Sequence, residues 1–206
     1  MNQNNKYIIG LTGGIATGKS TVANILKKCG FKVIDYDNIS REIISKDIDT
    51  IELIRQSFGD EFVVDGTINR KKLGEYIFSN TEKREILNDI THNRIIDISI
   101  DALNSYDDEI VFMDIPLLFE SWKRIEEKGI VFDEIWLVSS DFEVQKARLI
   151  ERDQINSDYA ETKISSQMPL KEKSKKSDII IDNNGNLEEL ESKVKHEIQN
   201  LLERTN

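Results

Sequence analysis

The sequence is poor in several residue types that define whole classes of protein. Its 206 residues include a single cysteine, Cys29, so the chain can form neither an internal disulfide nor a zinc site built from cysteines. The two histidines, His92 and His196, are too few for a histidine-rich metal site. Two prolines and ten glycines exclude collagen-like and low-complexity chains, and they favour a fold rich in helices.

Long apolar runs and an excess of positive charge are also absent. The longest apolar stretches, residues 110–113 and 115–119, are separated by Asp114, and both are far shorter than the ~20 residues that a bilayer span requires. Residues 1–5 are polar and lack the apolar centre of a signal peptide. Lysine and arginine total 28 against 38 aspartates and glutamates, and this net charge of −10 disfavours nonspecific nucleic-acid binding. We therefore expect a soluble, cytoplasmic protein with no membrane or nucleic-acid partner.

Short apolar runs rich in β-branched residues alternate with longer helical patterns. The expected strands are residues 7–11, 31–34, 110–115, 134–138 and 179–181. Alternation of this kind predicts an α/β fold, in which a five-stranded parallel sheet is flanked by helices on both faces.

The first and last helices have clear apolar stripes. The first stripe consists of Val22, Ile25, Leu26 and Cys29, and Gly30 follows where a left-handed C-terminal cap is expected. We interpret Cys29 as a small core residue. The last stripe consists of Leu187, Leu190, Val194, Ile198 and Leu201. His196 lies off this stripe and is expected to face solvent.

Two long segments interrupt the alternation. The gap between the second and third strands, 34–110, is too long for one crossover helix. It contains turn signals at 59–60 and 65–66 and helical patterns over 73–78 and 86–103, so we expect a mostly helical inserted subdomain. The second segment, residues 141–176, carries many charges and no strand signal, which is typical of a mobile helical flap.

A glycine-rich loop joins the first expected strand to the first helix. Residues 13–20 match the pattern G-x-x-x-x-G-K-[ST], whose curled backbone points N–H groups at phosphate oxygens beside a helix N-terminus. Lys19 then neutralises the β- and γ-phosphates, and Ser20 offers a hydroxyl to Mg²⁺. The residues expected to bind the nucleotide phosphates are Gly13, Gly14, Ile15, Ala16, Thr17, Gly18, Lys19, Ser20 and Thr21. We call residues 13–21 the phosphate loop.

The rest of the chain narrows the class of nucleotide-binding protein. A GTPase needs an N-K-x-D motif, which is missing, and the D-x-x-G match at 182–185 comes after all the other strands. Motors and helicases are normally much larger. A small kinase with helical insertions is the class that fits.

Acidic residues follow the strands where ligands bind in such folds. Asp37, after the second strand, is placed to orient an acceptor hydroxyl and accept its proton, or alternatively to cap a helix that starts near Asn38. Asp114, at the end of the third, is either a Mg²⁺-side aspartate or a turn residue. Glu120 either faces the acceptor site or is simply exposed.

The flap contributes positive charge. Arg148 and Arg152 lie four residues apart, so they share one helix face and could close over a triphosphate; alternatively they form a solvated face paired with Glu151 or Asp153. The lysine-rich run over 171–176 is interpreted as a solvated face.

Over nearly its whole length, the sequence resembles one family, the dephospho-CoA kinases. The strings that carry the resemblance are 9–15 (IGLTGGI), 33–37 with Arg41 (VIDYD), 58–78, 87–92, 114–120 (DIPLLFE), 152–153, 167–169 (QMP) and 178–185 (DIIIDNNG). Several ordered strings are far more specific than the phosphate loop alone.

The resemblance implies a P-loop kinase fold in three parts. The nucleotide core covers about 1–39, 104–140 and 177–206, a CoA-binding helical insertion covers about 40–103, and a lid covers about 141–176. The implied reaction transfers the γ-phosphoryl group of ATP, with Mg²⁺, to the 3′-hydroxyl of the ribose of dephospho-CoA. The implied partners are these small molecules, and the implied protein is a monomer or a weak homo-oligomer. The competing hypotheses are a kinase of another small acceptor, such as a nucleoside monophosphate, and a non-catalytic nucleotide-binding switch.

The resemblance also assigns residues. The expected catalytic residues are Asp37, Lys19 and Arg148. Arg41, His92 and Glu120 are expected on the acceptor side with Asp37, and Ser20 and Asp114 at the metal. Arg152 in the lid, and Asn183 and Gly185 beside the adenine, complete the ATP site. The chain departs from the family at Ala16 and Thr17, where glycine and serine are common, and at Asn93, where proline is usual.

Overall fold

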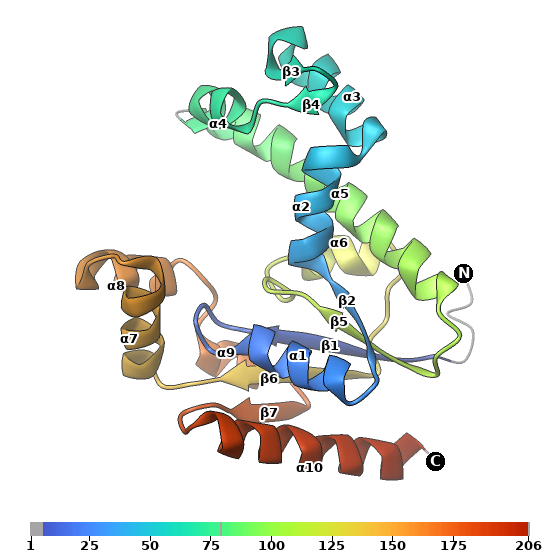
Figure 1. Ribbon diagram of the computed structural model, residues 1–206, viewed down its shortest axis with the longest axis vertical. Coiled ribbons are helices and arrows are strands. Elements are labelled where there is room, and N and C mark those ends of the chain that lie inside the picture. Colours follow the sequence, from blue (N-terminus) through green and yellow to red (C-terminus); the bar gives the residue numbers. More distant parts are fainter. Residues whose placement is uncertain (1–5, 79, 206) are drawn as a thin grey trace. The chain divides into compact units, whose positions relative to one another are not determined.

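The computed structural model describes residues 6–78 and 80–205, which form two compact units (Figure 1). The first unit holds the described residues up to Ile34 and from Tyr106 onward, and the second is Asp35–Ser105. Within the described ranges, no helix is long and apolar enough to cross a membrane.

The first unit is built on a five-stranded sheet in the order β2-β5-β1-β6-β7. Its strands are β1 (Tyr7–Gly13), β2 (Lys32–Asp35), β5 (Ile110–Asp114), β6 (Glu134–Ser139) and β7 (Ile179–Asp182). The β1–β5, β1–β6 and β6–β7 pairs are parallel, and the expected α/β sheet is confirmed. The register sets Leu11 opposite Asp114 and Gly13 opposite Val138. The loop after β1 therefore emerges at the carboxyl end of the sheet, where Asp114 also ends β5.

One face of this sheet is covered by α1 (Lys19–Lys28) and α10 (Leu187–Thr205) (Figure 1). Their apolar stripes meet strand residues such as Phe112 and Trp136, whose rings contact edge to face at 5.2 Å between centroids. The chain after β5 lies against Gly10 of the central strand, because a Cβ there would lie 3.0 Å from Leu118 and 3.2 Å from Phe132. The segment continues into α6 (Trp122–Glu127), which buries Ile125.

Both expected stripes are wrong at one end. α1 ends at Lys28, and the chain turns at Cys29 and Gly30, where φ is +95°, so the Cys29 side chain leaves the stripe and is exposed. Leu187 is 61% exposed because it begins α10 and its stripe starts only at Leu190. His196 is exposed, as expected.

The segment expected to be a helical flap consists of three helices. They are α7 (Phe142–Asp153), α8 (Ser157–Ser165) and α9 (Leu170–Ser174). α7 and α8 pack against each other, and Lys146–Glu161 and Lys163–Asp153 ion pairs join them. Residues 141–176 therefore contain no strand, as the sequence indicated.

The second unit is mostly helical. Its elements are α2 (Tyr36–Lys46), α3 (Ile48–Phe58), the 3₁₀ turn η1 (Asp60–Phe62), β3 (Val63–Val64), β4 (Thr67–Ile68), α4 (Arg70–Phe78) and α5 (Thr81–Ser105). The turn signal at 65–66 joins β3 to β4 with φ values of +50° at Asp65 and +73° at Gly66, the conformation of a tight hairpin turn. A small apolar core including Ile54, Phe62 and Leu73 lies beside it.

An ion pair fastens α3 to α5 in this unit. Arg94 holds the Asp47 carboxylate with two nitrogens, at 3.0 and 2.7 Å, and also reaches Asp49 at 3.1 Å. Asp47 is at the same time the N-cap of α3, where it accepts from the Thr50 backbone at 2.9 Å. The Arg94 hydrogen bond lowers the pKa of Asp47 to about 2.

Candidate active site

The phosphate loop has the local geometry that phosphate binding requires. Gly13 ends β1, and Gly18 is the N-cap of α1, with φ at +92°. Only glycine fits position 18, since a Cβ would also lie 2.2 Å from the Asn183 amide nitrogen. The first N–H groups of α1 have no intrahelical acceptor and add to the positive end of the helix dipole, so anions are attracted to this point.

Ala16 adopts a left-handed conformation inside the loop, with φ at +59°. Glycine adopts this conformation freely, whereas a Cβ in it costs roughly 1–2 kcal/mol. Next to it, Thr17 is buried, and its hydroxyl donates to the Gly14 carbonyl at 2.9 Å. This bond fixes the curl of the loop.

Lys19 and Asp114 form an ion pair at the carboxyl edge of the sheet. Both side chains are close to fully buried, at 11% and 4% exposure, so each charge depends on the other for its solvation. Ser20 is exposed in the first turn of α1, directly after Lys19.

The oxygen donors here suit Mg²⁺. The ion takes one or two protein oxygens and completes its shell with phosphate oxygens and water. The described residues contain no cluster of three or more histidine, cysteine, aspartate or glutamate residues that could hold a metal alone. The Ser20 hydroxyl and the Asp114 carboxylate therefore fit a metal bound together with a nucleotide.

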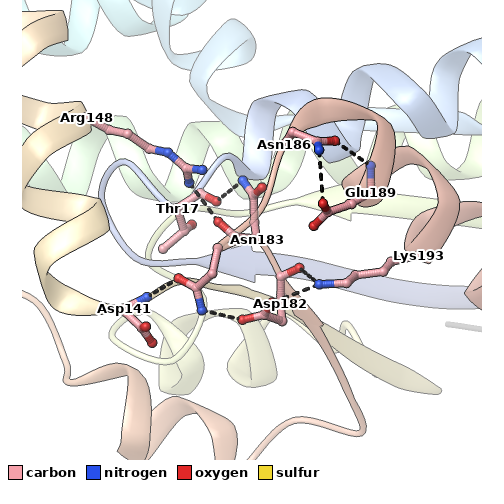
Figure 2. A network of polar contacts seen from close by, with 9 residues as sticks. Thr17, Asp141, Arg148, Asp182, Asn183, Asn186, Glu189 and Lys193 are labelled. Carbon is pink, nitrogen blue, oxygen red and sulfur yellow. Dashed lines mark hydrogen bonds and ion pairs between the residues drawn. The ribbon is translucent and has the colours of Figure 1, made fainter.

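A pocket of about 230 Å³ lies beside the phosphate loop. It is lined by Gly18, Thr21, Arg148, Asn183, Gly185, Asn186, Leu187 and Leu190. The Asn183 side chain donates to the Thr17 carbonyl at 2.8 Å, and Arg148 donates to the Asn183 carbonyl at 2.9 Å (Figure 2). The structure thus brings the phosphate loop together with three residues that sequence reasoning placed on the ATP side, namely Arg148, Asn183 and Gly185.

The loop that carries Asn183 is held at both ends (Figure 2). Lys193 pairs with Asp182 at 2.8 Å, and this hydrogen bond lowers the pKa of Asp182. Asn184 accepts from the Asp141 backbone at 2.7 Å, and Asn186 caps α10 by accepting from the Glu189 backbone at 3.0 Å. The pocket wall is therefore preorganised by its own polar contacts.

Arg152 lies elsewhere. It is exposed and pairs with Asp153 at 2.8 Å, and this contact, followed by one from Lys163, lowers the pKa of Asp153 to about 2. The structure does not place Arg152 in the pocket with Arg148, although both residues belong to α7.

Three expected residues lie in the second unit. The N-cap of α2 is Asp35, which accepts from the Asn38 backbone at 3.0 Å, so the alternative in which Asp37 caps the helix is wrong. Asp37 is exposed in the first helical turn, and its backbone carbonyl accepts from Arg41 at 3.2 Å. His92 is half-buried in α5, which runs unbroken through the position where the family usually has proline.

Glu120 has partners that sequence reasoning did not find. Its carboxylate pairs with Lys173 at 2.9 Å and accepts from the Met168 backbone at 3.0 Å. The expectation of a solvated face over 171–176 is wrong for Lys173, which is fully buried, and holds for the exposed Lys171, Lys175 and Lys176. The only available signal was helical spacing, because Lys173 lies three residues after Leu170.

The sheet order, with a phosphate loop after its central strand, defines the class: the chain is a P-loop kinase, a phosphotransferase. The family model described as dephospho-CoA kinase matches residues 7–189. The chain belongs to the dephospho-CoA kinase family.

Individual relatives and solved structures are similar to this chain over most of its length. A dephospho-CoA kinase of Fusobacterium nucleatum is 46% identical over 190 residues, which are 91% of this chain and 94% of the relative. Among solved structures, TT1252 from Thermus thermophilus is 31% identical with a TM-score of 0.77, and covers 95% of this chain and 98% of its own. A dephospho-CoA kinase from Campylobacter jejuni is 25% identical with a TM-score of 0.65, and covers 96% and 98% of the two chains.

Proposed function

We propose that the chain transfers the γ-phosphoryl group of ATP to the 3′-hydroxyl of the ribose of dephospho-CoA, giving coenzyme A and ADP. The observation that carries this proposal is the phosphate loop beside the Asn183 pocket, in a chain that belongs to the dephospho-CoA kinase family. The site of action is the cytoplasm, and the active form is a monomer or a weak homo-oligomer.

In this proposal ATP binds wholly to the first unit. The adenine occupies the pocket of about 230 Å³, against Arg148 and Asn183, and the phosphates lie on residues 13–21. Lys19 neutralises charge on the transferring group, as does the N-terminus of α1. Residues 141–176 act as the lid, and Arg152 joins the site only when the lid closes and excludes water.

The Ser20 hydroxyl and the Asp114 carboxylate would hold Mg²⁺. The ion, when bound, neutralises and orients the phosphate oxygens. Asp114 is paired with Lys19, and if it held the ion instead, the Lys19 ammonium would be free to contact the phosphates. With either partner the buried carboxylate would be paired, which avoids the penalty for an isolated buried charge.

The acceptor is bound by the helical insertion, residues 40–103, through contacts that include Arg41 and His92, and by Glu120. Asp37 accepts the proton of the 3′-hydroxyl and aligns its oxygen for attack. Its carboxylate suits this task because the capping role at α2 is already filled by Asp35. Positioning and electrostatic stabilisation supply most of the rate enhancement in phosphoryl transfer, because its transition state is loose.

The test is ADP release by the purified chain with ATP·Mg²⁺ and one acceptor at a time. We expect release with dephospho-CoA and not with AMP, CMP or pantothenate. Asp37→Asn should lower kcat by about 10²–10⁴ with ATP affinity little changed. Asp60→Asn is the matched control, since Asp60 is an exposed aspartate of the same unit. Release with a nucleotide acceptor instead would overturn the assigned substrate, and ATP binding without any release would leave a nucleotide-binding switch.

A further inference from the structure

Lys173 is the most unusual charged residue of the described chain. Its side chain has no exposed surface, although it belongs to a lysine-rich segment whose other lysines are exposed. Burying an ammonium group is energetically unfavourable unless other groups replace its water. The identity of those groups therefore indicates what the buried charge is for.

The partners of Lys173 are Glu120 and the phosphate loop. Its Nζ lies 2.9 Å from a Glu120 carboxylate oxygen and donates to the Gly13 carbonyl at 3.4 Å. Gly13 is the last residue of β1 and the first of the phosphate-loop motif. The buried ammonium therefore contacts both Glu120 and the first residue of the phosphate-loop motif.

A second contact reaches the same loop from the same segment. The Gln167 side-chain oxygen accepts from the Ile15 backbone N–H at 2.9 Å. This N–H group is thereby directed at the chain between α8 and α9, and the N–H groups of the α1 N-terminus are left for phosphate. Met168, the next residue, donates its own backbone N–H to Glu120 at 3.0 Å, so the segment is anchored where it meets the loop.

Close packing accompanies these hydrogen bonds. A Cβ at Gly14 would lie 2.9 Å from the Gln145 side-chain oxygen and 3.2 Å from Leu170, the first residue of α9. The loop backbone thus rests directly on the lid segment at Gly14, between the two hydrogen-bonded residues Gly13 and Ile15.

We propose that Gln167 and Lys173 are positioning residues of the phosphate loop. The hydrogen bond of Lys173 holds Gly13 and that of Gln167 holds Ile15, so that the loop is preformed for the nucleotide phosphates. A preformed loop does not lose backbone freedom when ATP binds, and it places the γ-phosphoryl group accurately for transfer. The same contacts join the lid segment to the loop, so movement of residues 167–173 would shift the loop backbone that binds the phosphates. This role rests on the proposed function, because it needs the loop to bind a triphosphate.

The test compares Gln167→Met, which removes the acceptor at similar size, with Gln199→Met, the same change at an exposed position of α10. We expect Gln167→Met to raise the KM for ATP about fivefold to tenfold, the usual effect of one lost hydrogen bond, and to lower kcat. Affinity for adenosine, which has no phosphate, should not change. Hydrogen exchange of the Ile15 amide, followed by NMR in the full chain, should become faster.

Lys173→Met needs a partner variant, because it leaves Glu120 without its cation and can impair folding. The double variant Lys173→Met/Glu120→Gln removes both charges, and Lys171→Met, at an exposed position of the same helix, is the matched control. We expect the double variant to recover thermal stability but to keep a raised KM for ATP, since the Gly13 carbonyl still lacks its donor.

The outcomes separate this inference from the proposed function. If the unmodified chain phosphorylates dephospho-CoA, and the Gln167 and double variants keep its KM for ATP and its Ile15 exchange rate, the positioning role is wrong. If the unmodified chain binds no ATP, the proposed function itself fails. If the Lys173 variants only lower the melting temperature and leave the kinetics unchanged, the buried lysine serves stability and the proposal is overturned.

Discussion

The side-chain amide of Asn183 donates a hydrogen bond to the backbone carbonyl of Thr17 over 2.8 Å, and so joins two loops that are 166 residues apart in the chain. Asn183 is buried, and Gly18 beside it has no side chain that would block the contact. The end of the last strand therefore supports the phosphate loop that follows the first. One asparagine both lines the pocket proposed for the base and holds the phosphate loop.

Replacing Asn183 with leucine should damage both functions. The variant leaves the Thr17 carbonyl without a donor inside the protein, which costs about 1–3 kcal/mol of stability. We expect a lower melting temperature and a KM for ATP raised about tenfold, measured by ADP release at saturating dephospho-CoA. Asn24→Leu, the same change on the exposed side of α1, should alter neither quantity. Equal kinetics in the two variants would contradict the role of Asn183.

Asp114→Asn should separate metal binding from nucleotide binding. The carboxylate is paired with Lys19, and its loss frees the ammonium for phosphate while removing a proposed metal ligand. We expect the Mg²⁺ concentration for half-maximal activity to rise about tenfold or more, and the affinity for metal-free ATP to increase. Magnesium titrations of activity and calorimetric binding without metal measure the two effects. Asp107→Asn, at an exposed position, is the control; an unchanged Mg²⁺ requirement would remove Asp114 from the metal site.

Local signals in the sequence were enough for the sheet and the phosphate loop. Strand position depends on short apolar runs, and the loop has its own glycine and lysine spacing, so both are readable from neighbouring residues. The apolar stripes of the first and last helices were predicted correctly only away from the helix ends. Cys29 fits the spacing but lies past the last turn of α1, and no periodicity shows where a helix actually stops.

Contacts between segments that are distant in the chain could not be predicted from the sequence. Lys173 belongs to a lysine-rich run whose composition is typical of a solvated face. Its burial is explained only by its tertiary partners, Glu120 and Gly13. The capping of α2 by Asp35 rather than Asp37 depends on a helix boundary two residues earlier than expected. Boundaries and long-range polar contacts are set by packing of the whole fold, which a single sequence does not display.

The Asp47–Arg94 pair should make stability depend on acidity. The folded-state pKa of Asp47 is lowered from 3.8 to about 2, so its contribution is complete above pH 4 and is lost as the pH falls towards 2. After screening by solvent, the pair is worth about 1 kcal/mol. Arg94→Met should therefore lower the melting temperature by about 2–4 °C at pH 6 and by progressively less below pH 4. Arg55→Met, whose partners are exposed, should show no such trend, and a constant difference for Arg94→Met at all pH values would contradict the assignment.

Ala16→Gly should relieve strain in the phosphate loop. Ala16 has a φ of +59°, where a Cβ costs roughly 1–2 kcal/mol, and glycine adopts the same angle without that penalty. Glycine also adds freedom to the unfolded chain, which offsets about 0.4–1 kcal/mol of the gain. We expect a net stabilisation of about 0.5–1 kcal/mol in urea unfolding, with the KM for ATP unchanged, because the backbone already has the conformation that glycine would adopt. Ala147→Gly, inside α7, should instead destabilise by about 1 kcal/mol, as glycine does in a helix interior. If Ala16→Gly destabilised the protein to the same extent, the left-handed conformation at this position would be wrong.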